Sequence, residues 1–195
     1  MARRAQIERK TAETSVRLTL DLDGTGANRI ATGVGFLDHM LTHVAVHGLV
    51  DLTVEAEGDL HVDAHHTVED VGICLGRALA EALGDRAGLE RFGEATVPMD
   101  EALAHVALDL SGRAHLSYDD AVPPGKVGEV DTELFREFFE AVVRNAGITL
   151  HVRVLAGRNS HHKIEAVFKA FGRALRRAAA ADPRRAGVAS TKGSL

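Results

Sequence analysis

Two copies of one motif suggest a metal site. His-His-Thr-Val-Glu at 65–69 recurs as His-His-Lys-Ile-Glu at 161–165, and Gly-Arg-Ala-Leu at 76–79 recurs at 172–175 with the same offset of 96 residues. Residues at i and i+4 share one face of a helix, so each copy places a histidine beside a glutamate. This geometry is typical of metal ligands, and the common register indicates an internal duplication.

Imidazole nitrogens and carboxylate oxygens suit a first-row divalent ion such as Mn²⁺, Fe²⁺ or Zn²⁺, and a motif without thiolate argues against structural zinc. Adjacent histidines point about 100° apart on a helix, so both cannot be ideal ligands of one ion. We therefore expect two ions, each bound by one motif and by a histidine of the other. The alternative, an exposed polar helix start, explains a single copy better than a repeated one. The expected ligand sets are His65, Glu69 and His162, and His161, Glu165 and His66.

Other histidines are weaker candidates. His39, His43 and His47 are four residues apart, so they share nearly one face of a helix predicted over 36–46. We expect at least one of them to enter the site. His151 stands alone in a predicted strand, which by itself is more typical of a structural residue than of a ligand.

Three cationic groups could bind a phosphate monoester. They are Arg91, Arg113 in Asp109-Leu-Ser-Gly-Arg113, and the C-terminal Ser190-Thr-Lys192-Gly. Guanidinium forks and an ammonium charge match phosphate oxygens. Each group alone is weak evidence, because surface cations are usually solvated and a segment beyond Pro183 would ordinarily be a disordered end.

The elements that must position these residues repeat along the chain. The pattern predicts a duplicated β-β-α-β-α unit, with halves at 1–92 and 93–195, the second half carrying the C-terminal phosphate-binding tail. Hairpins joined by helices favour an α+β fold, with helices on one face of each mostly antiparallel sheet. The predicted segments are a hairpin of 14–22 with 29–32, a helix 36–46 capped at Gly48, strand 50–56 and helix 65–83, then strands 95–98, 103–110 and 115–118, helix 132–145, strand 148–155 and helix 160–181.

Composition excludes several classes of protein. The 195 residues are 45% hydrophobic, which allows a substantial core, and a net charge of −5 provides no broad cationic face for nucleic acid. No run approaches the ~18 apolar residues that a membrane span needs, and residues 1–10 lack the apolar region of a signal peptide. Cys74 is the only cysteine. We expect a cytoplasmic protein that binds neither nucleic acid nor membrane.

The ordered motifs resemble the imidazoleglycerol-phosphate dehydratase family over nearly the whole chain. They are Arg9-Lys-Thr-Ala-Glu13-Thr, Gly35-Phe-Leu-Asp-His39-Met, His47-Gly, the two His-His motifs, Asp109-Leu-Ser-Gly-Arg113 and Ser190-Thr-Lys192-Gly. The resemblance implies two four-stranded sheets of the ribosomal protein S5 domain 2-like type, and two Mn²⁺ ions per active site. It implies that His39 and His151 join the metal ligands, and that His43 stands where glutamine is expected and is tolerated rather than a ligand. It also implies a homo-oligomer of 24 subunits with active sites shared between chains. The residues expected to bind substrate are Glu13, His39, His47, Arg91, Arg113, Ser190 and Lys192.

The resemblance further implies conversion of imidazoleglycerol phosphate, a small-molecule phosphate, to imidazoleacetol phosphate and water in histidine biosynthesis. Because no carbonyl acidifies the departing proton, a metal-bound imidazolate would expel the hydroxyl. Glu13 and Glu165 are alternative bases for the proton of the next carbon, His47 is a further catalytic candidate, and Asp100 is a weaker one. A dinuclear phosphate-ester hydrolase and a metal-buffering protein are the rival interpretations.

Overall fold

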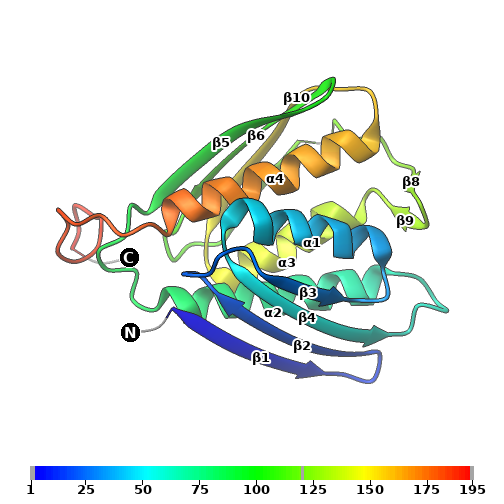
Figure 1. Cartoon of the computed structure of the whole chain (residues 1–195), viewed down its shortest axis with the longest axis horizontal. Coiled ribbons are helices and arrows are strands. Elements are labelled where there is room, and N and C mark those ends of the chain that lie inside the picture. The colour runs from blue at the N-terminus through cyan, green and yellow to red at the C-terminus, as the bar shows by residue number, and fades with distance from the viewer. Residues whose placement is uncertain (1–2, 120, 194–195) are drawn as a thin grey trace.

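Two four-stranded sheets enclose four helices in the computed structural model, which describes residues 3–119 and 121–193 (Figure 1). In each sheet one neighbouring pair of strands is parallel and the other two are antiparallel, which confirms the predicted mostly antiparallel α+β fold. The first sheet has the order β1 (Arg4–Lys10), β2 (Thr14–Asp21), β4 (Asp51–Gly58), β3 (Asn28–Ala31). The second has the order β5 (Phe92–Met99), β6 (Ala102–Asp109), β10 (Thr149–Ala156), β7 (His115–Tyr118).

The four helices are α1 (Gly35–Gly48), α2 (His65–Leu83), α3 (Leu134–Ala146) and α4 (Ser160–Ala178). The bounds of α2 are those predicted, whereas α3 begins two residues later than predicted and α4 ends at Ala178 rather than near residue 181. Each half contains the predicted β-β-α-β-α unit with one further strand before its first helix. A small hairpin, β8 (Lys126–Val127) with β9 (Val130–Asp131), precedes α3 and was not predicted.

The repeated glycine of the Gly-Arg-Ala-Leu sequence allows close helix packing. Helix α2 packs on α3, and α4 packs on α1, so each pair takes one helix from each half. A Cβ atom on Gly76 would lie 2.6 Å from the carbonyl oxygen of Val142, and one on Gly172 would lie 2.9 Å from that of Val44. Equivalent glycines therefore permit equivalent crossings, and the two halves share one core.

The predicted hairpin of residues 14–22 with 29–32 is wrong. Strand β2 pairs with β1 and β4, whereas β3 lies beside β4 and runs parallel to it. The carboxylate of Asp51, at the start of β4, accepts backbone N–H groups from Thr25, Gly26 and Ala27 at 2.7, 3.1 and 2.9 Å. These bonds hold the loop against β4, so the chain crosses to the far side of that strand.

The end of α1 also differs from the prediction. Leu49, and not Gly48, adopts the left-handed conformation, with a φ of 51°. Gly48 is the last helical residue, and a Cβ there would lie 3.3 Å from the carbonyl oxygen of Gly172. Glycine at position 48 therefore allows the close contact between α1 and α4, and it does not cap the helix.

The second half contributes an aromatic core between α3 and α4. Five phenylalanine side chains are fully buried and contact one another, which fixes how these helices pack against their sheet. Within the described residues, none of the helices has the length and apolar character needed to cross a membrane. The buried phenylalanines are Phe135, Phe138, Phe139, Phe168 and Phe171.

Candidate active site

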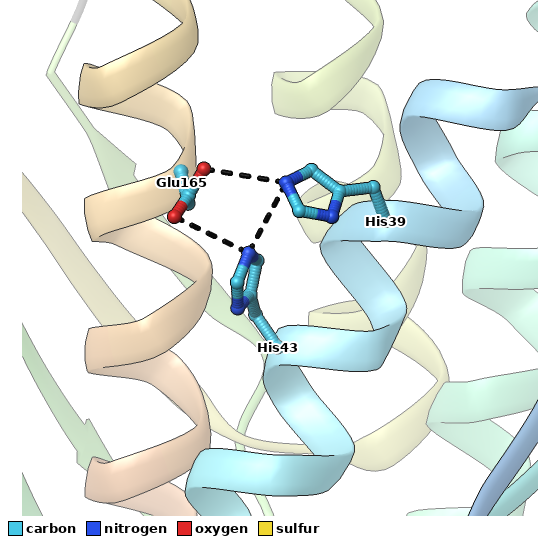
Figure 2. Close-up of side chains that lie close together, drawn as sticks. All are labelled: His39, His43 and Glu165. Atoms are coloured by element: carbon cyan, nitrogen blue, oxygen red, sulfur yellow. Dashed lines mark hydrogen bonds and ion pairs between the residues drawn. The ribbon is translucent and has the colours of Figure 1, made fainter.

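Three side chains that could bind one metal ion meet where α1 crosses α4 (Figure 2). The Nε2 atoms of His39 and His43 each lie 3.3 Å from a carboxylate oxygen of Glu165, and 3.3 Å from each other. Donor atoms that bind one ion at about 2.0–2.2 Å are themselves about 3.0–3.6 Å apart. The spacing therefore fits a shared divalent ion, and within the described residues this is the one group of three that meets ligand distances.

Glu165 is the electrostatic centre of this cluster. It is 5% exposed, and it also contacts His161 Nε2 at 3.1 Å and Lys169 Nζ at 2.6 Å. Burial alone would raise the pKa of Glu165, but the hydrogen bond from Lys169 and the positive charges of His43 and Lys169 outweigh it and lower the pKa to about 2. Glu165 is therefore ionised at neutral pH.

Two imidazoles of α1, those of His43 and His47, have lowered pKa values and are neutral at neutral pH. Burial lowers the pKa of His43 to about 4, and the nearby charge of Glu165 offsets this only in part. Burial, followed by the charges of Lys169 and Arg173, places the pKa of His47 below its usual value. The rings of His43 and His47 stack with centroids 5.7 Å apart. Their uncharged nitrogens can accept a proton, bind a metal or hydrogen-bond a substrate.

The second histidine of each His-His pair is bound to a carboxylate. His66 Nδ1 lies 3.0 Å from Asp59 and 3.8 Å from Glu13, and His162 Nδ1 lies 2.7 Å from Glu101. The hydrogen bond from His66 to Asp59 raises the pKa of His66, and the bond to Glu101 does the same for His162. Glu13 thus lies beside a motif histidine.

The structure assembles the predicted metal ligands in part. It brings His39, His161 and Glu165 together, but within the described residues of one chain neither predicted set is complete. The two motifs begin α2 and α4, and these helices pack on α3 and α1 respectively, so the motifs lie on different helix pairs. His151 is exposed on β10, where its ring centroid is 5.8 Å from that of His115. We call the group of His39, His43 and Glu165, together with the adjacent His161, the His39 cluster. The predicted ligands that lie outside it are His65, His66, Glu69, His151 and His162.

Two of the predicted phosphate-binding residues, Arg91 and Arg113, lie beside Asp109. Arg91 donates two hydrogen bonds to this carboxylate, at 2.6 and 2.9 Å, and Arg113 lies 3.9 Å from it. Arg91 also donates to the carbonyl oxygen of Ala189, which holds the C-terminal tail beside both arginines. Ser190 and Lys192 follow directly, and the side chain of Arg113 is 68% exposed, so cations there could bind an anion.

The phosphate-binding groups lie far from the His39 cluster in one chain. The backbone N–H of Arg91 donates to the carbonyl oxygen of Ala178, the last residue of α4, whereas Glu165 lies near the start of that helix (Figure 1). Thirteen residues of helix separate Glu165 from Ala178, which is about 20 Å at 1.5 Å per residue. A small phosphate ester cannot span this distance.

Sequence reasoning missed three residues that contact the candidate site. His43 was placed on the same helix face as His39 and His47 but was left outside the ligand sets. Lys169 stands four residues after Glu165 on one helix face, a spacing that could have indicated their ion pair. Asp59 lies seven residues before His66, in a loop without regular spacing, and Glu101 lies 61 residues before His162, so neither contact left a periodic pattern in the sequence.

Comparisons with known proteins agree on one family. A family model described as "Imidazoleglycerol-phosphate dehydratase" matches residues 32–175. The curated imidazoleglycerol-phosphate dehydratases of Parasynechococcus marenigrum and Moorella thermoacetica are 60% and 57% identical, with coverage of 100% of this chain and of 97% and 100% of theirs. The crystal structure of the Staphylococcus aureus enzyme is similar with a TM-score of 0.83 at 44% identity, covering 92% of this chain and 99% of that one. The crystal structure of IGPD from Pyrococcus furiosus in complex with (S)-C348 is similar with a TM-score of 0.84 at 36% identity, covering 97% of this chain and 100% of that one.

Proposed function

The chain belongs to the imidazoleglycerol-phosphate dehydratase family and is a hydro-lyase of histidine biosynthesis, and we propose that it works with two Mn²⁺ ions per active site shared between neighbouring chains. Its substrate and product would be imidazoleglycerol phosphate and imidazoleacetol phosphate. Cys74 is buried and unpaired, which supports our inference that the protein works in the reducing cytoplasm.

The donor atoms fit the proposed metal. Imidazole nitrogens and carboxylates without thiolate suit Mn²⁺, and the 3.3 Å between His39 Nε2 and the carboxylate of Glu165 fits two ligands of one ion. When bound, such ions act as Lewis acids that favour negative charge on the imidazole ring of the substrate. The proposed metal ligands are His39, His65, His66, Glu69, His151, His161, His162 and Glu165.

Glu13 is the better candidate for the base. Dehydration removes the hydroxyl from the carbon attached to the ring and a proton from the next carbon. Glu165 is 5% exposed and its carboxylate is engaged by three histidines and Lys169, so it is not free to take a proton from a substrate. Glu13 is 56% exposed at its side chain and lies beside His66, so it is free to meet a substrate. We propose that Glu165 binds the metal and that Glu13 removes the proton. Neutral His47 would form a hydrogen bond with the substrate.

The roughly 20 Å between Glu165 and the end of α4 is the observation that carries the shared-site proposal. The phosphate and the imidazole of the substrate are joined by a three-carbon chain, so the tail of one chain must meet the metal ligands of another. Arg91, Arg113, Ser190 and Lys192 would then hold the phosphate. We propose a homo-oligomer, with 24 subunits as the expected number.

One assay tests the proposed reaction. Purified protein loaded with Mn²⁺ should convert imidazoleglycerol phosphate to the ketone without releasing phosphate. Free phosphate as the product would instead support a dinuclear phosphate-ester hydrolase. Turnover that survives complete removal of metal would contradict the proposed role of Mn²⁺.

A further inference from the structure

The same ring contact has been built twice from unrelated positions. The Nδ1 atom of His66 lies 3.0 and 3.2 Å from the carboxylate oxygens of Asp59, and that of His162 lies 2.7 Å from Glu101. The two histidines are equivalent in the duplication, but Asp59 and Glu101 are not equivalent to each other.

The two carboxylates also reach their histidines from different elements. Asp59 follows β4 in the loop before α2, whereas Glu101 lies in the turn between β5 and β6. The first-half counterpart of the β5–β6 turn is the β1–β2 turn, which carries Glu13, and the carboxylate of Glu13 lies 3.8 Å from His66 Nδ1. The duplication therefore places a glutamate near each second histidine, whereas the closer contact of Asp59 with His66 is particular to the first half.

We propose that Asp59 and Glu101 are positioning residues for metal binding, each holding the second histidine of its motif with Nδ1–H toward the carboxylate and Nε2 free as a ligand. A carboxylate accepts a hydrogen bond but cannot donate one when ionised, so it selects the tautomer protonated at Nδ1. The same partner fixes the ring orientation and makes Nε2 a stronger donor to a metal. This inference rests on the proposed two-metal function.

Glu101 is itself held in place. It accepts the backbone N–H groups of Arg158 and Asn159, at 3.1 and 2.8 Å, just before α4 begins. Its carboxylate thus joins the start of α4 to the ring of His162. Asp59, in contrast, directs its carboxylate to the ring of His66, so its replacement disturbs less of the backbone.

The test measures metal binding in the holoenzyme, with free Mn²⁺ followed by its electron paramagnetic resonance signal during dialysis. Asp59→Ala should weaken one of the two ions about 10- to 100-fold and leave the other unchanged. Glu101→Ala should weaken the other ion, and the double variant should weaken both. Asp59→Asn and Glu101→Gln should recover most of the affinity, because an amide oxygen can still accept the Nδ1–H.

Asp63→Ala is the matched control. Asp63 lies in the same loop as Asp59 and accepts the backbone N–H of His65 at 2.7 Å, so this variant removes an equal charge without touching a ring. Equal loss of metal in Asp63→Ala and Asp59→Ala, or unchanged affinity for both ions in Asp59→Ala, would overturn the inference. Among the described residues the carboxylate of Asp59 bonds to the ring of His66 and to no backbone N–H group. A change in metal affinity in Asp59→Ala is therefore not explained by loss of a backbone hydrogen bond at the start of α2.

The pairing of variants sharpens the test. The proposed ligand sets place His66 with Glu165, so Asp59→Ala and Glu165→Gln should weaken the same ion. Wild-type stoichiometry tests the underlying proposal separately. Fewer than two ions per subunit in the wild type would contradict the two-metal function, whereas two ions held normally by Asp59→Ala would overturn this inference alone.

Discussion

Replacing Glu165 by Gln should destabilise the metal-free protein at neutral pH, apart from any effect on metal binding. The surroundings of Glu165 lower its pKa from 4.5 to about 2. That difference corresponds to roughly 3 kcal/mol at 1.36 kcal/mol per pH unit, with little screening by solvent because Glu165 is 5% exposed. Glutamine keeps the shape but leaves the half-buried ammonium of Lys169 without an anionic partner.

The pH dependence of this loss has a defined sign. Because the folded-state pKa lies below the unfolded value, the stabilisation is fully present well above pH 4.5 and disappears as the pH falls through the interval from 4.5 to about 2. The gap in stability between wild type and Glu165→Gln should therefore be largest at neutral pH and narrow in acid. Urea unfolding followed by circular dichroism, in the presence of chelator, measures this gap.

Glu69→Gln provides the matched control. Glu69 occupies the same motif position in the first half, but it is exposed and forms no ion pair within the described residues. Its replacement should leave the unfolding midpoint of the metal-free protein unchanged, although both variants should bind metal more weakly. Equal midpoints for the two variants at neutral pH would refute the electrostatic account of Glu165.

Three further predictions follow from the fold and the site. Arg113→Ala or Lys192→Ala should raise KM about 10- to 100-fold, as loss of a charge-assisted phosphate contact worth ~1.5–3 kcal/mol implies; steady-state kinetics with unchanged KM would exclude that contact. Gly76→Ala should lower the free energy of unfolding in urea by about 1–3 kcal/mol, because its Cβ would lie 2.6 Å from a carbonyl oxygen of α3. Gly125→Ala is the control and should leave the free energy of unfolding unchanged, because no atom of the described residues, its chain neighbours aside, lies within 4 Å of a Cβ there. Chelation should remove about two Mn²⁺ per subunit. Because shared ligands stabilise the oligomer, chelation should also reduce the particle size measured by light scattering, and an unchanged size would reject metal-dependent assembly.

Local patterns predicted the elements better than the connections between them. Helix α2 has the predicted bounds because apolar residues recur with helical spacing from His65 to Leu83. The hairpin failed because the three bonds from the loop to Asp51 depend on a side chain more than twenty residues away. Such bonds leave no periodic signal in the sequence.

The candidate site shows the same division. The i+4 spacing within the second motif correctly placed His161 beside Glu165, since both lie on one helix. The contacts of Asp59 and Glu101 with their histidines depend on how loops fold over the helix starts, which no spacing reveals. The distance from Glu165 to Arg91 likewise depends on the length of α4, which lies between them.

Mixing two variants impaired in different parts of the proposed site tests the shared active site most directly, at a substrate concentration well below the raised KM. One variant, Glu165→Gln, lacks a proposed metal ligand, and the other, Arg113→Ala with Lys192→Ala, lacks proposed phosphate contacts. If the tail of one chain serves the metal ligands of another, random co-assembly in equal amounts should leave about one quarter of the sites with all of these residues intact. The account predicts that co-expressed or reassembled mixtures regain roughly that share of wild-type activity. Mixed oligomers with no more activity than the average of the two parents would contradict it.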